Sequence, residues 1–287
     1  MTATIALLGH PVAHSLSPRF QQAALDALGI DARYEAWDTS DADLRVAVER
    51  LRSGGMLGAN VTVPHKVAVA GLVDRPDPLA ELAGAVNTIV RRDGLLYATN
   101  TDVAGVLRAI EEAGITVRGS NVLLVGAGGV ARAVVVAMQQ GGAASLTIAN
   151  RTLEKARQLV AVAGADLAVQ VCPLDPTSDA AAEALRAPMS RAELVIHSTS
   201  LGMRHGPDEQ ATPVPPELFR AEQTAFDLVY APERTPFLNA AERAGARTIG
   251  GLSMLIHQGA ESFRLWTGEA PPLDVMFAAA RSAAAEG

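Results

Sequence analysis

The sequence predicts an α/β protein of two domains, and three observations support this prediction. Short apolar runs alternate with helix-type patterns along nearly the whole chain, which is typical of largely parallel sheets covered by helices. A glycine-rich turn at residues 126–131 separates an apolar run from a helix pattern in mid-chain. The length of 287 residues is enough for two domains of ordinary size.

The composition fits a folded protein with a substantial core. Hydrophobic residues make up 49% of the chain and charged residues 19%. The net charge of -7 argues against nucleic acid or an anionic membrane surface as a partner. No apolar run reaches the roughly 18–20 residues of a membrane span. Residues 1–9 lack the basic start of a signal peptide and predict a first strand instead.

The single cysteine, Cys172, excludes a disulfide within the chain and a metal site made of thiolates. Histidine spacing offers no metal site either, because His10 and His14 flank Pro11 and cannot share a helix face. We therefore expect a cytoplasmic protein without a metal ion.

Local signals define the elements of the first half. Ser17-Pro18 offers an N-cap followed by a proline at the first helical position, so we expect a helix to begin there. Ser40 or Asp41 caps a second helix through residues 44–51, and Asp93-Gly94 is a hairpin signal. The expected strands are 5–8, 34–37, 59–63, 86–90 and 95–98, and a helix follows at 103–113.

Apolar runs and helix patterns alternate again after the glycine turn. The expected strands are 121–125, 145–149, 168–171, 194–197 and 225–229, and the expected helices are 130–140, one from Thr152, one from Thr235-Pro236, 252–266 and 274–285. The proline-rich residues 213–216 predict a loop. Because the last helices follow the final strand, they could complete the first domain. The expected domains are residues 1–102 with 251–287, and residues 103–250.

The glycine turn predicts a cofactor site. An apolar strand, the run Gly126-Ala127-Gly128-Gly129-Val130 and a helix together form the entry to a dinucleotide-binding unit of the Rossmann type. The next strand ends in Asn150-Arg151-Thr152, where an NAD-binding protein carries an acidic residue for the ribose. A guanidinium suits the 2′-phosphate of NADP instead, so the sequence predicts NADP. The alternative is that Arg151 is a solvated residue at a helix start.

Two polar segments before the glycine turn are candidates for the chemistry, residues 60–66 and 100–102. Asn60, Thr62 and Lys66 can point to one side of a strand and its exit turn, because side chains alternate along a strand. In a desolvated site Lys66 could act as a general acid or base that Asp102 orients. The alternative for an arbitrary lysine is a surface position.

Ser15 and Ser17 are candidates for a carboxylate site. Two hydroxyls near a helix N-terminus can bind a carboxylate together with the backbone N–H groups of the first turn. The alternative for Ser17 is that it is simply the N-cap of the helix, and the same residue can serve both roles.

Ordered motifs at compatible spacings make the chain resemble the shikimate dehydrogenase family nearly end to end. These motifs are Gly9-His10-Pro11 with Ser15-Leu16-Ser17-Pro18, residues 58–66, residues 83–88, Asn100-Thr101-Asp102, the glycine turn, Asn150-Arg151-Thr152, residues 199–203, and residues 251–255 leading to Gln258.

The resemblance implies an activity and a set of site residues. Members of this family reduce 3-dehydroshikimate to shikimate with NADPH on the way to aromatic amino acids. By similarity, Lys66 is the catalytic acid/base and Asp102 is its partner. The substrate residues implied are Ser15, Ser17, Thr62, Asn87, Asp102, Tyr230 and Gln258, and Leu228 and Gly251 are implied on the nicotinamide side. The family's first domain takes its last helices from the C-terminus.

Some positions depart from the family pattern and leave alternatives open. Val103 stands where Gly is usual, His197-Ser198 where Asn-Ala is usual, and Gly250 where Asp is frequent. A relative that acts on quinate or an amino-substituted shikimate is one alternative, and a non-catalytic NADP-sensing protein is another. The expected partner is a small-molecule substrate, and the expected assembly is a monomer or a homodimer.

Overall fold

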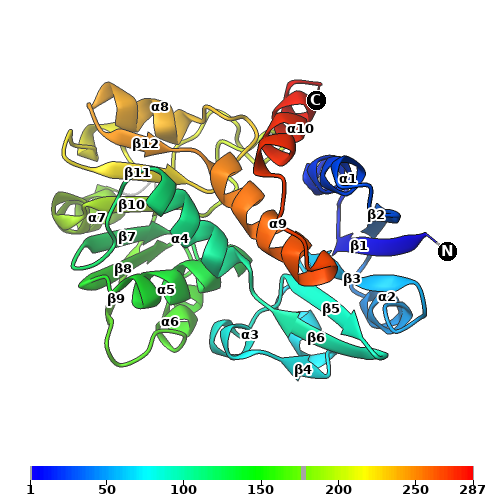
Figure 1. Ribbon diagram of the computed structural model, residues 1–287. Coiled ribbons are helices and arrows are strands. Elements are labelled where there is room, and N and C mark those ends of the chain that lie inside the picture. Colours follow the sequence, from blue (N-terminus) through cyan, green and yellow to red (C-terminus); the bar gives the residue numbers. More distant parts are fainter. Residues whose placement is uncertain (1, 176–178, 287) are drawn as a thin grey trace. The chain divides into compact units, whose positions relative to one another are not determined.

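The computed structural model describes residues 2–175 and 179–286, which form two compact units (Figure 1). Unit 1 consists of Met1–Gly105 and Ile256–Gly287, and unit 2 of Val106–Leu255. The chain passes from one unit to the other inside helices α4 (Asp102–Glu112) and α9 (Gly251–Thr267). The α/β class that the alternating pattern predicts is confirmed.

Unit 1 is built on a mixed sheet that has six strands within the described residues, in the order β2-β1-β3-β5-β6-β4. The strands are β1 (Ala3–Gly9), β2 (Ala32–Asp38), β3 (Met56–Val61), β4 (Arg75–Pro76), β5 (Thr88–Arg92) and β6 (Leu95–Thr99). Strand β1 is parallel to β2 and β3, and β5 is antiparallel to β3 and β6. The hairpin between β5 and β6 turns at Asp93 and Gly94, both with positive φ, as the Asp-Gly signal predicts.

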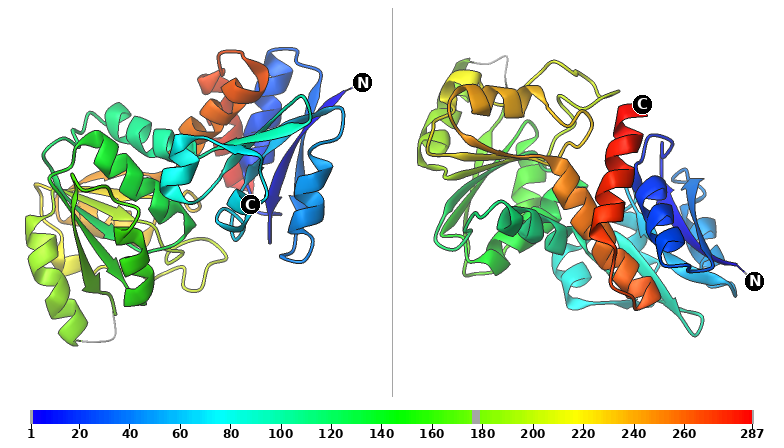
Figure 2. Two further views of the ribbon diagram at one scale, coloured as in Figure 1. Left: turned by 90° about the horizontal axis from the view of Figure 1, so that it is seen from below. Right: turned by 45° about the horizontal axis from the view of Figure 1, so that its top comes forward.

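Helices cover both faces of this sheet. Ala6 and Leu8 of β1 pack against α2 (Leu44–Arg50), the short helix η1 (Ala68–Gly71) and α3 (Pro78–Ala83). The helices α1 (Ser17–Ala27), α9 and α10 (Leu273–Glu286) lie together beside the sheet (Figure 2). Helix α9 approaches α1 so closely at Gly259 that a Cβ there would lie 2.5 Å from the Phe20 ring.

Unit 2 is built on a sheet with only parallel pairings among its described strands, in the order β12-β11-β10-β7-β8-β9. The strands are β7 (Asn121–Val125), β8 (Ser145–Asn150), β9 (Ala168–Pro173), β10 (Leu194–His197), β11 (Thr224–Asp227) and β12 (Arg247–Ile249). Read from β9 and numbered within the unit, the order is 3-2-1-4-5-6, which is that of the Rossmann fold. The helices are α5 (Gly129–Gly141), α6 (Leu153–Val160), α7 (Asp179–Arg191) and α8 (Pro236–Arg243), with a short helix η2 (Pro216–Leu218).

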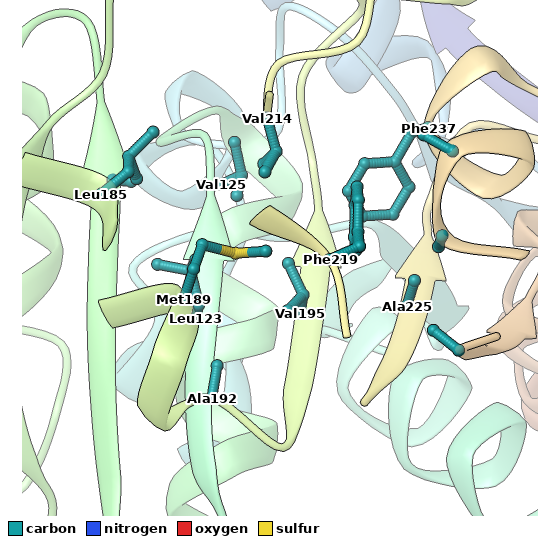
Figure 3. Packing of buried hydrophobic residues seen from close by; sticks show 14 of the residues in the cluster. Leu123, Val125, Leu185, Met189, Ala192, Val195, Val214, Phe219, Ala225 and Phe237 are labelled. Carbon is teal, nitrogen blue, oxygen red and sulfur yellow. The ribbon is translucent and has the colours of Figure 1, made fainter. Parts of the chain in front are cut away.

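An apolar cluster fixes helices α7 and α8 on the sheet of unit 2. Figure 3 shows Met189 beside Leu123 and Val195, and the rings of Phe219 and Phe237 next to each other. The ring centroids of this aromatic pair are 5.3 Å apart in an edge-to-face arrangement, a geometry that aromatic quadrupoles favour.

Several elements are absent from the sequence-based expectations. Strands β4 and β12 are too short for their alternation to show in the sequence. Helix α7 is alanine-rich and contains Pro188, so it lacks a clear apolar period. Helix α3 does carry a signal, because Asp77-Pro78 supplies an N-cap whose carboxylate accepts from the Ala80 N–H at 2.8 Å. In the second helix, Asp43 takes the N-cap position expected for Ser40 or Asp41.

None of the helices in the described part of the chain is both long enough and apolar enough to cross a bilayer.

We predict that Phe237→Ala lowers the free energy of unfolding by about 3–5 kcal/mol, because a large side chain that is 1% exposed leaves a cavity against Phe219. Urea unfolding followed by circular dichroism measures the loss. Val46→Ala, at a position that is 71% exposed, is the control and should change stability by less than about 0.5 kcal/mol. Equal midpoints for the two variants would contradict this account of the core.

Candidate active site

Lys66 and Asp102 form a largely buried ion pair in unit 1. The Lys66 Nζ lies 2.6 Å from Asp102 Oδ2, and the side chains are only 13% and 4% exposed. Asp102 is the first residue of α4, so its carboxylate lies at the positive end of the helix dipole. The Lys66 carbonyl accepts from the Val86 N–H at 2.7 Å, which anchors the exit turn of β3.

The strand directions explain why these two residues meet. Strand β5 is antiparallel to both β3 and β6, so β3 and β6 run in the same direction and end at the same edge of the sheet. Lys66 follows the end of β3, and Asp102 follows the end of β6. Asn87 directly precedes β5, which begins at that edge.

Asn87 joins this pair to Gln258. The Asn87 Nδ2 donates to Asp102 Oδ1 at 2.8 Å and to Thr101 Oγ1 at 2.9 Å, and it lies 3.2 Å from Gln258 Oε1. The Asn87 Oδ1 accepts from the Thr101 N–H at 2.7 Å. The structure therefore brings four of the predicted residues into one hydrogen-bonded group: Lys66, Asn87, Asp102 and Gln258.

Further buried polar residues support this group, and the sequence singles out Asn60 among them but not Tyr34 or Ser262. Ser262 lies within 2.7 Å of Thr88 Oγ1 and accepts from Asn60 Nδ2 at 3.0 Å. The Tyr34 hydroxyl donates to Asn60 Oδ1 at 2.7 Å, and burial raises the pKa of Tyr34 well above its ordinary value. No local motif marks Tyr34 or Ser262, because their role depends on strand register and on α9.

Thr62 is accommodated by a glycine on the neighbouring strand. A Cβ at Gly9 would overlap with Thr62 Cγ2, so a larger residue at position 9 would displace the threonine. The Thr62 N–H donates to the Leu8 carbonyl at 2.8 Å, which continues the hydrogen-bond ladder between β1 and β3 beyond the end of β3.

The start of α1 differs from the prediction for Ser17. Leu16 takes the N-cap position with helical φ and ψ, so Ser17 is already the first residue of the helix. The Ser15 Oγ accepts from the Ser17 N–H at 3.2 Å. Ser17 is therefore not the N-cap, and its hydroxyl is hydrogen-bonded to buried Tyr34.

The glycine turn lies between β7 and α5 in unit 2. Gly126 has a φ of +112°, and a Cβ there would lie 2.7 Å from Ser198 Oγ and 2.9 Å from Thr199 Cγ2. Gly128 is the N-cap of α5, where no side chain caps the helix and no acidic residue lies in the first turn. Ala127, Gly129 and Val130 are only partly buried. A helix N-terminus of this kind fits a diphosphate group.

The end of β8 carries the residues predicted for the 2′-phosphate. Arg151 and Thr152 are exposed, and Asn150 Nδ2 donates to the Thr152 carbonyl at 2.8 Å. Thr152 is the N-cap of α6, although its side chain makes no capping hydrogen bond. The exposed guanidinium and hydroxyl fit a phosphate bound at this strand end.

Two predicted nicotinamide contacts lie side by side. A Cβ at Gly251 would lie 2.6 Å from both the Leu228 and Val229 carbonyl oxygens, so only glycine permits this approach. Tyr230 follows in unit 2 and is partly buried, and burial raises the pKa of its hydroxyl. The other predicted substrate residues belong to unit 1. In residues 2–175 and 179–286, no cluster of three or more His, Cys, Asp or Glu side chains could hold a metal ion.

The combination of a Rossmann-type unit and a mixed α/β unit that holds a buried lysine–carboxylate pair is typical of nucleotide-dependent dehydrogenases. The family model described as the shikimate dehydrogenase substrate binding domain matches residues 7–89. The models described as shikimate / quinate 5-dehydrogenase and shikimate 5'-dehydrogenase C-terminal domain match residues 109–202 and 251–281. The chain belongs to the shikimate dehydrogenase family.

Relatives match the chain over nearly its whole length. The shikimate dehydrogenase (NADP(+)) of Moorella thermoacetica is 48% identical over 276 residues, which are 96% of this chain and 91% of that protein. The enzyme of the same name from Symbiobacterium thermophilum is 44% identical, over 97% and 94% of the two chains.

Solved structures agree with this relationship. The Thermus thermophilus shikimate 5-dehydrogenase in complex with NADP(H) and shikimate matches with a TM-score of 0.85 and 39% identity, over 98% of this chain and 99% of that one. The quinate dehydrogenase of Corynebacterium glutamicum in complex with NAD matches with a TM-score of 0.88 and 30% identity, over 98% and 99%.

We predict that two glycines of the turn, Gly126 and Gly128, differ sharply in how well they tolerate replacement by alanine. Gly126→Ala should lower the free energy of unfolding by about 1–3 kcal/mol, because the new Cβ meets Ser198 and Thr199 at an unfavourable positive φ. Gly128→Ala is the matched control, since the nearest atom to its Cβ would be 3.9 Å away. Thermal unfolding of both variants without cofactor measures the difference, and equal stability would refute the packing role of Gly126.

Proposed function

We propose that this protein catalyses the reversible, NADP-dependent reduction of 3-dehydroshikimate to shikimate, a reaction of aromatic amino acid biosynthesis. The observation that carries the proposal is the buried Lys66–Asp102 pair at 2.6 Å, held by Asn87 within unit 1. The names of the relatives, 48% and 44% identical, supply the substrate and the cofactor.

The proposal assigns one role to each unit. Residues 1–102 with 251–287 would form the substrate-binding and catalytic domain, and residues 103–250 the NADP-binding domain. Ser15 and Ser17 would bind the substrate carboxylate, and the polar groups of Thr62, Asn87 and Gln258 would bind its hydroxyls. Tyr230 of unit 2 is a further proposed substrate residue. The glycine turn would bind the diphosphate, and Arg151 with Asn150 and Thr152 the 2′-phosphate.

The chemistry of the residues supports a proton-relay role for Lys66. When bound, NADPH would supply a hydride to the substrate carbonyl carbon, and negative charge would then develop on the carbonyl oxygen. The Lys66 ammonium can stabilise that oxygen and then donate a proton to it. Asp102 keeps the ammonium in place through its 2.6 Å contact in a largely buried position. In the reverse direction, neutral Lys66 accepts the hydroxyl proton.

A kinetic experiment tests the proposed function. Initial rates are measured from the absorbance of reduced nicotinamide, with shikimate or quinate and with NADP or NAD. We expect the highest kcat/KM for shikimate with NADP. A preference for quinate or an amino-substituted shikimate would identify a different substrate, and tight NADP binding without turnover would identify a sensor.

We also propose a cytoplasmic location and a monomeric or homodimeric assembly. The buried free thiol of Cys172 suits a reducing compartment that maintains NADPH. Light scattering coupled to gel filtration distinguishes the two assemblies, and a larger oligomer would contradict the proposal.

We predict that Lys66→Ala lowers kcat by about 10²–10⁴-fold with little change in the KM for shikimate, because the proton donor is lost. Asp102→Asn should also lower kcat, since the ammonium loses its anchoring charge. Arg19→Ala, at a side chain that is 67% exposed, is the control and should retain activity. Near-native turnover of a folded Lys66→Ala enzyme would remove this lysine from the mechanism.

We predict that Arg151→Ser raises the KM for NADP by roughly 10–100-fold and leaves the KM for NAD unchanged, because hydrogen bonds to a charged phosphate are lost. Arg108→Ser, which removes another exposed arginine, should leave both values unchanged. The measurement is a set of initial rates at saturating shikimate. An equal rise for both cofactors would show that Arg151 does not recognise the 2′-phosphate.

A further inference from the structure

Unit 2 contains a buried titratable pair that the proposed mechanism does not use. His197 ends β10, Asp227 ends the neighbouring strand β11, and both side chains are 0% exposed. The His197 Nδ1 lies 2.9 Å from Asp227 Oδ1. Removing two charged or strongly polar groups from water costs free energy unless each finds partners. We therefore expect this pair to hold particular neighbouring groups in place.

His197 holds the loop that lies on the glycine turn. The His197 Nε2 is 2.5 Å from Thr199 Oγ1, which also accepts from the Leu201 N–H at 3.2 Å. When Nδ1 alone carries the ring proton the Thr199 hydroxyl donates to Nε2, and when Nε2 carries a proton the direction reverses. In both states the Thr199 oxygen is fixed by two contacts.

The same loop closes directly on Gly126. The Ser198 N–H and hydroxyl both donate to the Val125 carbonyl, at 2.8 and 3.0 Å. A Cβ at Gly126 would meet Ser198 and Thr199 within 3 Å, so the loop and the turn are in van der Waals contact. A displacement of Thr199 would therefore also shift the glycine turn, which is proposed to bind the diphosphate.

Asp227 holds the backbone at Leu228 and Val229, which is the nicotinamide side of the proposed cofactor site. Its Oδ1 accepts from the Val229 N–H at 2.9 Å, and its Oδ2 accepts from the hydroxyl of Thr235, the N-cap of α8. The Leu228 N–H donates to the His197 carbonyl at 2.9 Å. The Leu228 and Val229 carbonyls are the atoms against which Gly251 packs.

We infer that His197 is a positioning residue for cofactor binding, which acts through Thr199 on the glycine turn and through Asp227 on the backbone at Leu228 and Val229. The inference rests on the proposed NADP site. It gives a role to His197, a position where the resemblance leads one to expect asparagine.

Two substitutions separate the contacts of His197. Asparagine can place an amide nitrogen where Nδ1 faces Asp227, but it is too short to reach Thr199. His197→Asn should therefore retain the Asp227 contact and a folded chain, with some loss of stability because the smaller side chain leaves space beside Phe237. It should weaken NADP binding by roughly threefold to tenfold, the effect of one lost hydrogen bond. Thr199→Val, which removes the hydroxyl at similar volume, should weaken NADP binding at least as much, because it also removes the acceptor of the Leu201 N–H.

The test measures NADP binding to the full chain by isothermal titration calorimetry without substrate, for both single variants and the double variant. We expect the double variant to bind NADP no more weakly than Thr199→Val alone, because that variant has already lost the contact with His197. The KM for shikimate should stay unchanged, a separation that general loss of structure would not produce. His205→Asn, at an exposed histidine with positive φ, is the control.

The outcomes distinguish this inference from the proposed function. Wild-type protein that does not bind NADP at all would refute the proposed function. Wild-type protein that binds NADP, with folded variants of unchanged dissociation constant, would overturn the role of His197 alone. Additive effects in the double variant would overturn the coupling through Thr199. If His197→Asn does not fold, Thr199→Val by itself decides the question.

Discussion

The strand register of unit 1 is the constraint on which the candidate active site depends. Asn60 pairs with Thr88, and Thr88 pairs with Thr99, so the ends of β3 and β6 and the start of β5 meet at one edge. A shift of one residue would turn each side chain to the opposite face. Lys66, Asn87 and Asp102 then could not form their short contacts.

Mutual hydrogen bonding makes it possible to bury the polar group around Asn60, Thr88 and Ser262 in this unit. Asn60, Thr88 and Ser262 are at most 5% exposed, and each makes hydrogen bonds to other members of the group. A buried polar group without a partner would be costly, so the network favours one arrangement of α9 on the sheet. The same requirement fixes Asn87 and, through it, the carboxylate of Asp102.

Unit 2 differs, because the proposed diphosphate site depends on backbone N–H groups at a helix N-terminus rather than on polar side chains. Gly126 lets the turn pass close to Ser198, and Gly251 lets α9 begin against the Leu228 and Val229 carbonyls. These two glycines keep backbone segments close at the carboxyl ends of parallel strands, where open α/β sheets bind their ligands. The His197–Asp227 pair contacts the Thr199 hydroxyl and the Val229 N–H, on the two loops that pack against these glycines.

The sequence by itself determined the α/β class, the glycine turn at Gly126 and the polar segments that carry Lys66 and Asp102, because these depend on local periodicity and residue type. It did not determine the cap of α1, where the backbone at Leu16 is already helical, nor the short strand β12. Only the tertiary structure decided the partners of Asn87, Tyr34 and His197. Their contacts join residues far apart in the chain, and strand order and register, which no local pattern encodes, bring them together.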